Sequence, residues 1–467
     1  MLFNSFTFAL FFIVVAVVLW TAPARMRNGW LLIASLVFYA SWIPQYVLLL
    51  LLEVGVSYVL LLGIVHTARS KLFLAISVIF SLGMLAYFKY ADLLVSSSAP
   101  ILERMGVAAP QPPHVLLPLG ISFVTFMIMG LAIDAYRQRG SCARSLSEYA
   151  LFVTFFPHLI AGPILRGPDL IPQLRSGGRL DVVRARRALW LITSGMTKKI
   201  VFADTLLAPY ANLVFASPGF AGAPDHLLAM YSFAFQIYFD FSGYTDMGRG
   251  CALLLGFDLP MNFREPYLSR DPSEFWRRWH ITLSEWLRDY LYVALGGNRV
   301  RPLRVYVNLF LTMLLGGLWH GAGWNFLIWG GLHGLLLVGH RVAGGRRRDP
   351  ERPLAATDLP RIVVLFHAVC VLWVFFRAPT FEGAVAFLSR LASGPWDGPW
   401  PAVQCGVIAA CVALHWIERV LREHRGRLQA WTATGLPAVA ESFAIGIAVG
   451  VVLLFGGFGG EFIYFQF

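Results

Sequence analysis

The sequence predicts an all-α polytopic membrane protein, and three observations carry that prediction. Hydrophobic residues make up 57% of the 467 residues. Charged residues make up only 14%, whereas a soluble domain usually contains about 25%. Because about 20 apolar residues cross the bilayer core as a helix, long uncharged stretches indicate transmembrane helices. The stretches without Asp, Glu, Lys or Arg include 1–24, 28–52, 105–133, 305–340 and 442–460.

Twelve apolar segments are candidate spans, so we expect about 11–13 transmembrane helices. Shorter apolar pieces near 149–161 and 275–295 are expected to dip into the bilayer or lie at its surface. The segment 5–22 lacks the basic residue that precedes the apolar core of a cleavable signal peptide, so we expect a retained span. The candidate spans are 5–22, 29–42, 44–66, 72–91, 115–135, 188–207, 227–256, 305–319, 322–340, 361–377, 400–417 and 438–458.

The basic loops predict how the chain is oriented, because Lys and Arg collect in the cytoplasmic loops of membrane proteins. Alternation of the spans then places both termini on the opposite side, together with the sparsely charged loops 93–114 and 378–398. We attribute the net charge of +12 to basic residues that lie in cytoplasmic loops and contact anionic lipid headgroups. Nucleic-acid binding is not expected, because no soluble basic module is present. The loop residues are Arg25, Arg27, Arg69, Lys71, Arg137, Arg139, Arg144, Arg341 and Arg346–Arg348.

The chain is expected to form a single integral-membrane domain over residues 1–467. We divide it into N-terminal spans (1–145), a catalytic core (146–345) and C-terminal spans (346–467). The five cysteines show no CxxC pair and no Cys/His ligand spacing, so neither a zinc site nor a disulfide framework is predicted.

The run LLGGLWHGAGWNFLIWGGLHG, residues 314–334, places two histidines where no other side chain can ionise. The arginines at both ends of 305–340 predict a hairpin that enters and leaves the membrane on the cytoplasmic side. His320 lies 16 residues beyond Arg304, which corresponds to roughly 24 Å of helix in a core about 30 Å thick. Four glycines are expected to let the chain break and reverse there: Gly316, Gly317, Gly321 and Gly323.

His320 is either a core histidine bonded to a backbone carbonyl or a functional residue in a cavity. Irregular backbone at membrane depth persists only where it lines an enclosed or water-filled cavity. Ionisable residues within the membrane are functional candidates by default. The chain break and the flanking Trp319 and Trp324 favour the functional interpretation. His333, in the middle of a helical stretch, is more typical of a structural residue.

A second polar constellation is DPSEFWRRWHITLSEWLRDYLYVALGGNR, residues 271–299. On a helix, its aromatic face and its charged side chains point in different directions. That helix is either an anchor at the membrane surface or a wall in which His280 faces a tunnel while arginines bind an anionic group. The aromatic face holds Trp276, His280 and Leu283, and the charged side chains outside it are Glu274, Arg277 and Arg278.

The segment QIYFDFSGYTDMGRG, residues 236–250, carries acids within an apolar span. Aspartates at membrane depth must be paired or in contact with water. The spacing of three residues allows Asp246 and Arg249 to form an ion pair, and the alternative is that Asp240 and Asp246 belong to the wall of an active site.

The segment TFFPHLIAGPILRGPDLIPQL, residues 154–174, contains prolines that forbid one continuous helix. We expect a short re-entrant loop that carries His158 and Arg166. We favour a structural role for this loop over a functional one.

Base catalysis by histidine is the chemistry that these segments favour. No GxSxG, P-loop, HExxH or dinucleotide-binding fingerprint occurs in a credible strand–helix context. A neutral imidazole can take a proton from a hydroxyl group as the oxygen attacks an acyl carbon. Burial lowers the pKa of an imidazole from about 6.5, which keeps it neutral and able to accept a proton.

These motifs resemble the membrane-bound O-acyltransferase family, and more narrowly its bacterial alginate O-acetyltransferase branch. The resemblance implies a ring of helices with re-entrant segments around a central tunnel. It also implies the bacterial inner membrane, and the orientation predicted from the basic loops then makes both termini periplasmic. His320 matches the essential histidine of the family, and His280 matches its second polar position. The motifs are FWRRWHITLSEWLRDYLYVALGGNR, LLGGLWHGAGWNFLIWGGLHG, FDFSGYTDM, FFPHLIAGPILR and the terminal FIYFQF.

The resemblance further implies acetyl transfer from a cytoplasmic thioester, such as acetyl-CoA, toward hydroxyl groups of an exported polysaccharide such as alginate. It implies periplasmic partner proteins. We expect no tightly bound cofactor and no metal. His320 either deprotonates the acceptor hydroxyl directly, or the acetyl group passes first to a partner protein. Arg277 and Arg278 are the candidates for donor phosphate. The full set of substrate-binding candidates is Trp276, Arg277, Arg278, Asp240, Tyr244, Asp246, Trp319 and Asn325.

Three alternatives stay open. A D-alanyl or other acyl transferase of the same family would act on a different cell-envelope polymer. A transporter or flippase without acyl chemistry would also tolerate broken helices and buried acids, although no inverted repeat is evident. A scaffold of a secretion complex would tolerate changes at His320 and His280.

Overall fold

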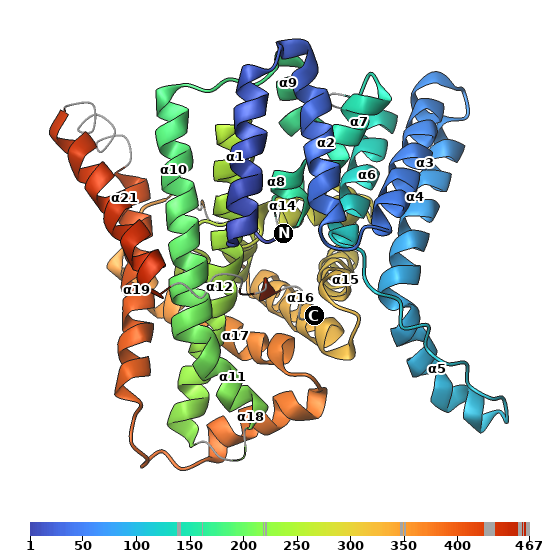
Figure 1. The fold of residues 1–467 in the computed structure, drawn as a ribbon. Coiled ribbons are helices and arrows are strands. Elements are labelled where there is room, and N and C mark those ends of the chain that lie inside the picture. Colours follow the sequence, from blue (N-terminus) through green and yellow to red (C-terminus); the bar gives the residue numbers. More distant parts are fainter. Residues whose placement is uncertain are drawn as a thin grey trace. The chain divides into compact units, whose positions relative to one another are not determined.

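The computed structural model describes residues 1–467 except 138–141, 161, 218, 220–221, 346–348, 350–351, 425–434, 456–459, 461 and 464–467. Throughout this described part the regular elements are helices, and none is a strand (Figure 1). The all-α class is therefore confirmed. The basic residues Arg139 and Arg346–Arg348, on which the predicted orientation partly rests, lie outside the described residues.

The first compact unit comprises residues 1–189, 248–260 and 321–323. Within it, α3 packs against α4, and α4 packs against α6. The helices α4, η2 and α5 follow one another without a break over Ser70–Arg104. The elements are α1 (Phe6–Thr21), η1 (Ala24–Met26), α2 (Arg27–Ala40), α3 (Tyr46–His66), α4 (Ser70–Leu85), η2 (Ala86–Tyr90), α5 (Ala91–Arg104), α6 (Ile121–Tyr136), α7 (Leu146–Thr154), α8 (Phe156–Leu159), α9 (Gly167–Ser176) and the first part of α10 (Val182–Met196).

The second compact unit comprises residues 190–247, 261–320 and 324–467, and it holds most of the predicted site residues. Its elements are the end of α10, η3 (Thr197–Leu207), α11 (Ala208–Ala216), most of α12 (Ala223–Leu254), η4 (Pro266–Leu268), α13 (Pro272–Trp276), α14 (Ile281–Trp286), η5 (Leu287–Tyr292), α15 (Pro302–His320), α16 (Trp324–Val342), η6 (Ala356–Asp358), α17 (Leu359–Arg377), α18 (Phe381–Ser393), α19 (Ala402–Glu423) and α21 (Gly435–Phe455).

Six helical segments in the described chain are long and apolar enough to cross a membrane. Shorter apolar helices occupy Phe6–Thr21, Ile121–Tyr136 and Phe443–Phe455. The polytopic class is thereby confirmed, while the ring, the tunnel, the total of about 11–13 spans and the single domain stay predictions. The six segments are Tyr46–His66, Ser70–Arg104, Val182–Ala216, Pro302–His320, Ala356–Arg377 and Ala402–Glu423.

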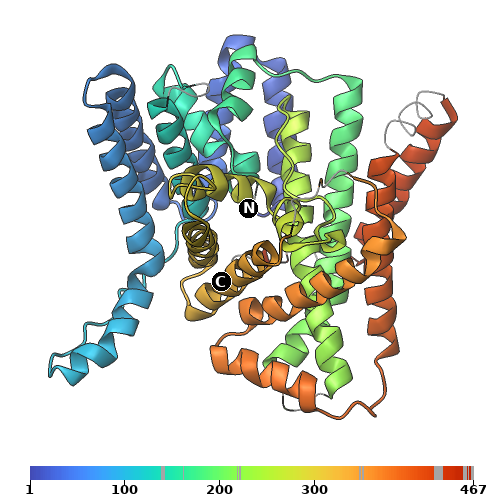
Figure 2. The same ribbon diagram turned by 180° about the vertical axis from the view of Figure 1, so that it is seen from behind.

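The predicted hairpin at 305–340 is present as α15 and α16, which pack against each other and appear as neighbouring gold helices in Figures 1 and 2. The chain reverses at residues 321–323, directly after His320. One part of the expectation was wrong: Gly316 and Gly317 do not break the chain but lie inside α15. A side chain at Gly317 would collide with the Phe326 carbonyl of α16, so this glycine permits close helix packing.

The expected helical face shared by Trp276, His280 and Leu283 was also wrong. The segment forms α13, then a break, then α14 followed directly by η5. The break falls at residues 277–280, although no proline or glycine occurs there. His280 therefore does not share a helical face with Trp276. It adopts a left-handed backbone conformation, with φ 42° and ψ 57°.

Candidate active site

The two histidines that the sequence singled out meet in the second unit. His320 is the last residue of α15, and His280 lies directly before α14. Their ring centroids are 6.4 Å apart. His280 is 0% exposed and His320 is 4% exposed. Two segments that are separated by 40 residues in the sequence thus bring two buried imidazoles close together.

Aromatic rings enclose His320. The ring centroids of Trp319, Trp329 and Phe376 lie 5.0, 5.1 and 5.7 Å from its imidazole, all in edge-to-face geometry. Phe376 belongs to α17, which packs against α16. Edge-to-face contacts are a favoured arrangement of aromatic rings, so the imidazole is held firmly in place. A tunnel that leads to it stays a prediction.

A second group of rings surrounds His280, which lies outside the six membrane-length segments. The rings of Phe241 and Trp319 lie 4.8 and 6.1 Å from it. Burial lowers the pKa of His280 to about 3. The imidazole is therefore neutral at physiological pH.

His333 packs differently from His320. It is buried and stacks on Phe275, with a centroid distance of 5.9 Å and an interplanar angle of 7°. The rings of Trp276 and Trp329 lie 5.0 and 4.8 Å from it. This environment fits the structural interpretation of His333, and it also locates Trp276 beside His333.

Asn325 holds the hairpin to the following helix. It is buried near the start of α16, and its side-chain amide donates a hydrogen bond to the carbonyl of Ala378, 2.7 Å away, just after α17. This contact fixes α16 relative to the end of α17. A role of Asn325 in substrate binding stays a prediction.

Arg278 lies in a buried network of charges rather than on an open surface. Its guanidinium is 2.9 Å from a Glu274 carboxylate oxygen and 3.6 Å from one of Glu265. Glu274 also pairs with Arg270 at 2.8 Å. Burial favours a raised pKa for Glu274, but hydrogen bonds from Arg270 and the charge of Arg278 outweigh it and lower the pKa.

These contacts disfavour Arg278 as a ligand of the donor phosphate, a role predicted for both Arg277 and Arg278. A phosphate at Arg278 would have to displace a buried ion pair, which is costly. Arg277 donates a hydrogen bond to the hydroxyl of Ser273, 3.0 Å away. Of the two arginines, Arg277 is the better candidate, and the assignment stays a prediction.

Asp240 and Asp246 of α12 are paired with lysines that the sequence reasoning missed. Asp246 lies 3.1 Å from Lys198, which also pairs with Glu418 of α19 at 2.7 Å. Tyr238 donates a hydrogen bond to Glu418 at 2.9 Å. The signal for this network was two adjacent lysines inside the apolar stretch 188–207. The predicted pairing of Asp246 with Arg249 stays untested.

Asp240 is held by Lys199 and by the C-terminal segment. Lys199 pairs with Asp240 and, at 2.9 Å, with Asp204. The backbone amide of Ile463 donates a hydrogen bond to the Asp240 carboxylate, 2.8 Å away. Lys199 and Asp204 both lie on η3, whose π-helical geometry brings residues five apart onto one face.

The C-terminal segment reaches the aromatic rings near His280. Phe462 is buried, and its ring centroid lies 4.8 Å from that of Tyr244 and 5.6 Å from that of Phe241. Phe241 in turn contacts His280. Of the terminal motif FIYFQF, residues 464–467 lie outside the described part of the chain.

In the first unit, His158 and Arg166 have structural surroundings. His158 is buried, and its Nε2 lies 3.2 Å from the carbonyl of Phe152. The backbone amide of Arg166 donates to Asp169 at 2.7 Å, at the start of α9. These contacts fit the predicted structural loop.

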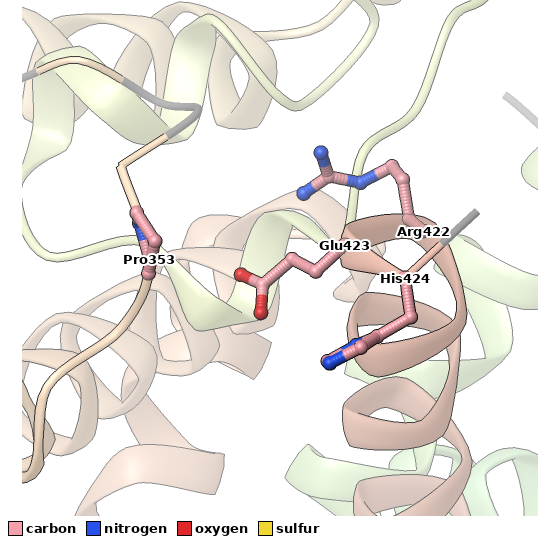
Figure 3. Close-up of a pocket in the computed structure, with 4 residues that line it drawn as sticks. All are labelled: Pro353, Arg422, Glu423 and His424. Carbon is pink, nitrogen blue, oxygen red and sulfur yellow. The ribbon is translucent and has the colours of Figure 1, made fainter. Parts of the chain in front are cut away.

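A pocket of about 510 Å³ lies at the end of α19, lined by Pro353, Arg422, Glu423 and His424. Figure 3 shows Glu423 and His424 projecting from α19 toward Pro353. Arg422 is already paired with Glu265 at 2.9 Å, and the end of the helix carries partial negative charge. The mixed lining does not favour an anion. Within the described chain, no three His, Cys, Asp or Glu side chains group as metal ligands.

The sequence of this chain is similar to those of known proteins. Residues 136–377 match the family model described as MBOAT, membrane-bound O-acyltransferase family. A probable alginate O-acetylase of Azotobacter vinelandii is 42% identical over 404 residues, which cover 85% of this chain and 79% of that protein.

Two relatives act on other polymers, as their names state. A peptidoglycan O-acetyltransferase of Helicobacter pylori is 36% identical over 78% of this chain and 73% of its own length. A teichoic acid D-alanyltransferase of Bacillus subtilis is 27% identical over 64% of this chain and 82% of its own length. The chain is therefore similar to proteins that, by their names, transfer different acyl groups.

Proposed function

The chain belongs to the membrane-bound O-acyltransferase family, and from this premise we propose that it transfers acetyl groups to an exported polysaccharide. As a member of the family it is a membrane-embedded O-acyltransferase. The acetyl group, the polysaccharide and the residues that act are the finer parts of the proposal. The similarity to an alginate O-acetylase and a peptidoglycan O-acetyltransferase supports them.

The observation that carries the proposal is the pair of buried imidazoles, His280 and His320, at a centroid distance of 6.4 Å. O-acyl transfer needs a group that removes the proton of the acceptor hydroxyl. A neutral imidazole can do so, and general-base catalysis of this kind typically accelerates a reaction about 10²- to 10⁴-fold. The firm packing around His320 supports a fixed position for that base.

In the proposed reaction His320 accepts the proton of the acceptor hydroxyl as the hydroxyl oxygen attacks the carbonyl carbon of the acetyl thioester. A carbon–oxygen bond forms, and the carbonyl electron pair moves onto oxygen. When that pair returns, the carbon–sulfur bond breaks, and the imidazolium gives its proton to the leaving thiolate. His280 is proposed to bind the reacting groups beside His320. The products are an acetyl ester and a free thiol.

The donor is proposed to be a cytoplasmic thioester such as acetyl-CoA, with Arg277 near its phosphates. The acceptor is proposed to be reached from the periplasmic side of a bacterial inner membrane, with the help of periplasmic partner proteins. Direct transfer to the glycan and transfer through a partner protein both use the same proton acceptor, so the proposal for His320 holds for either route.

The central test is His320→Ala in the full-length protein, with acetyl esters on the cell's exported polysaccharide measured by mass spectrometry. We expect acetylation to fall by at least 100-fold while the protein still inserts in the membrane. His333→Gln is the matched control, since it alters another buried histidine of the same hairpin, and it should retain most of the acetylation. Acetylation that persists in His320→Ala would refute the assigned base.

A D-alanyl transferase is the second candidate, because the chain is also similar to a teichoic acid D-alanyltransferase. The two activities differ in their acyl donor. Purified protein in liposomes, given either radiolabelled acetyl-CoA or a D-alanyl thioester of a carrier protein, distinguishes them. We expect label to be transferred from acetyl-CoA and not from the D-alanyl donor.

A further inference from the structure

The backbone of His280 is strained, and the residues around it must maintain that strain. Its φ of 42° lies in the left-handed region, which residues other than glycine rarely adopt. Strained residues persist only where their surroundings over-determine them, and they cluster at functional sites. In this structure residues 262–264 hold His280 in that conformation.

Residues 262–264 run alongside 278–282 and bond to both sides of His280. Before His280, the amide of Arg264 donates to the carbonyl of Arg278 at 2.9 Å. After it, the amide of Ile281 donates to the carbonyl of Asn262 at 2.9 Å. The conformation of His280 is thus fixed between two backbone hydrogen bonds.

Asn262 also caps α14 from outside the helix. The first amides of a helix lack partners within the helix, and usually the preceding side chain accepts one of them. His280 holds that preceding position, but its side chain makes no capping hydrogen bond. Instead the side-chain oxygen of Asn262 accepts from the Thr282 amide at 3.3 Å and from the Thr282 hydroxyl at 2.7 Å.

We propose that Asn262 is a positioning residue that acts through His280. By capping α14 in place of His280, it holds the strained backbone and directs the imidazole toward His320. Asn262 is 1% exposed, so water cannot substitute for it readily. The adjacent Phe263 packs on Trp279 at 5.1 Å and on Phe241 at 5.0 Å, which keeps Asn262 in register. This inference rests on the acyl-transfer function proposed above.

The first arm of the test measures the cap without any activity. Hydrogen exchange of the Ile281 and Thr282 amides is followed by mass spectrometry in the full-length protein. We expect Asn262→Ala to accelerate exchange at least tenfold. Asn262→Asp keeps the accepting oxygen and should preserve protection. Unchanged exchange in Asn262→Ala would overturn the capping role.

The second arm is a double-mutant cycle on acetyl transfer. Asn262→Ala should lower kcat at least tenfold with little change in KM for the donor, and Asn262→Asp should restore most of kcat. In a His280→Ala background, Asn262→Ala should cost no further activity, because its effect passes through the missing imidazole. Additive losses would show a merely structural role and overturn the proposal.

Asn308→Ala is the matched control for this cycle. Asn308 is likewise buried, and it donates a hydrogen bond to the carbonyl of Leu295 at 3.0 Å. Any loss that it causes should add to that of His280→Ala. If the wild-type protein transfers no acetyl group, the proposed function fails, whereas the exchange arm still decides whether Asn262 caps α14.

Discussion

Replacing Lys199 by methionine tests a buried charge cluster of the second unit. Its ammonium group is almost fully buried between the carboxylates of Asp204 and Asp240. Removing one partner of a buried ion pair costs about 3–5 kcal/mol, because the remaining charge lacks compensation. Here two carboxylates lose their cation, so we expect a loss near the upper end of that range.

The assay is equilibrium unfolding of the purified protein in mixed micelles by titration with SDS. The triple variant Lys199→Met, Asp204→Asn and Asp240→Asn removes all three charges, so no uncompensated buried charge is left. We therefore expect it to recover most of the stability. A loss below about 1 kcal/mol in the single variant, or no recovery in the triple variant, would refute the reasoning.

Two further predictions concern packing and pH. Gly317→Ala should destabilise the fold by about 1–3 kcal/mol, because the new methyl group would collide with the Phe326 carbonyl. Gly339→Ala, which has open space around it, should stabilise the fold by roughly 0.5–1 kcal/mol. Unfolding in micelles measures both variants, and equal effects would contradict the packing argument. Because folding lowers the pKa of Glu274, its network stabilises the fold above the ordinary pKa of the carboxyl group, and this stability is lost as pH falls through the lowered pKa. Unfolding measured from pH 6 down to pH 2 should show that loss below the ordinary pKa of the carboxyl group, and Glu274→Gln should flatten it.

The hairpin was predictable because its signals are local. Arginines flank an uncharged stretch, and glycine residues occur at the reversal that follows His320. The burial of His320 follows from the same pattern. Its proximity to His280 does not, because it depends on how α14 and α15 pack in three dimensions.

The break at His280 could not be read from the sequence. Residues 277–280 contain neither proline nor glycine, and Trp276, His280 and Leu283 have the spacing of residues on one face of a helix. The break results from pairing with Asn262 and Arg264, which lie 14 or more residues earlier. Likewise, the hydrogen bond from Ile463 to Asp240 joins residues 223 positions apart, and no local pattern announces such a contact.

The left-handed backbone at position 280 has a consequence for protein engineering. Glycine adopts that conformation without strain, but His280→Gly also deletes a fully buried ring that contacts Phe241, and the cavity left behind costs more than the relieved strain returns. The same exchange removes an imidazole from the proposed reaction centre. A screen for heat tolerance would thus retain the histidine, so stability and turnover favour the same residue at this position.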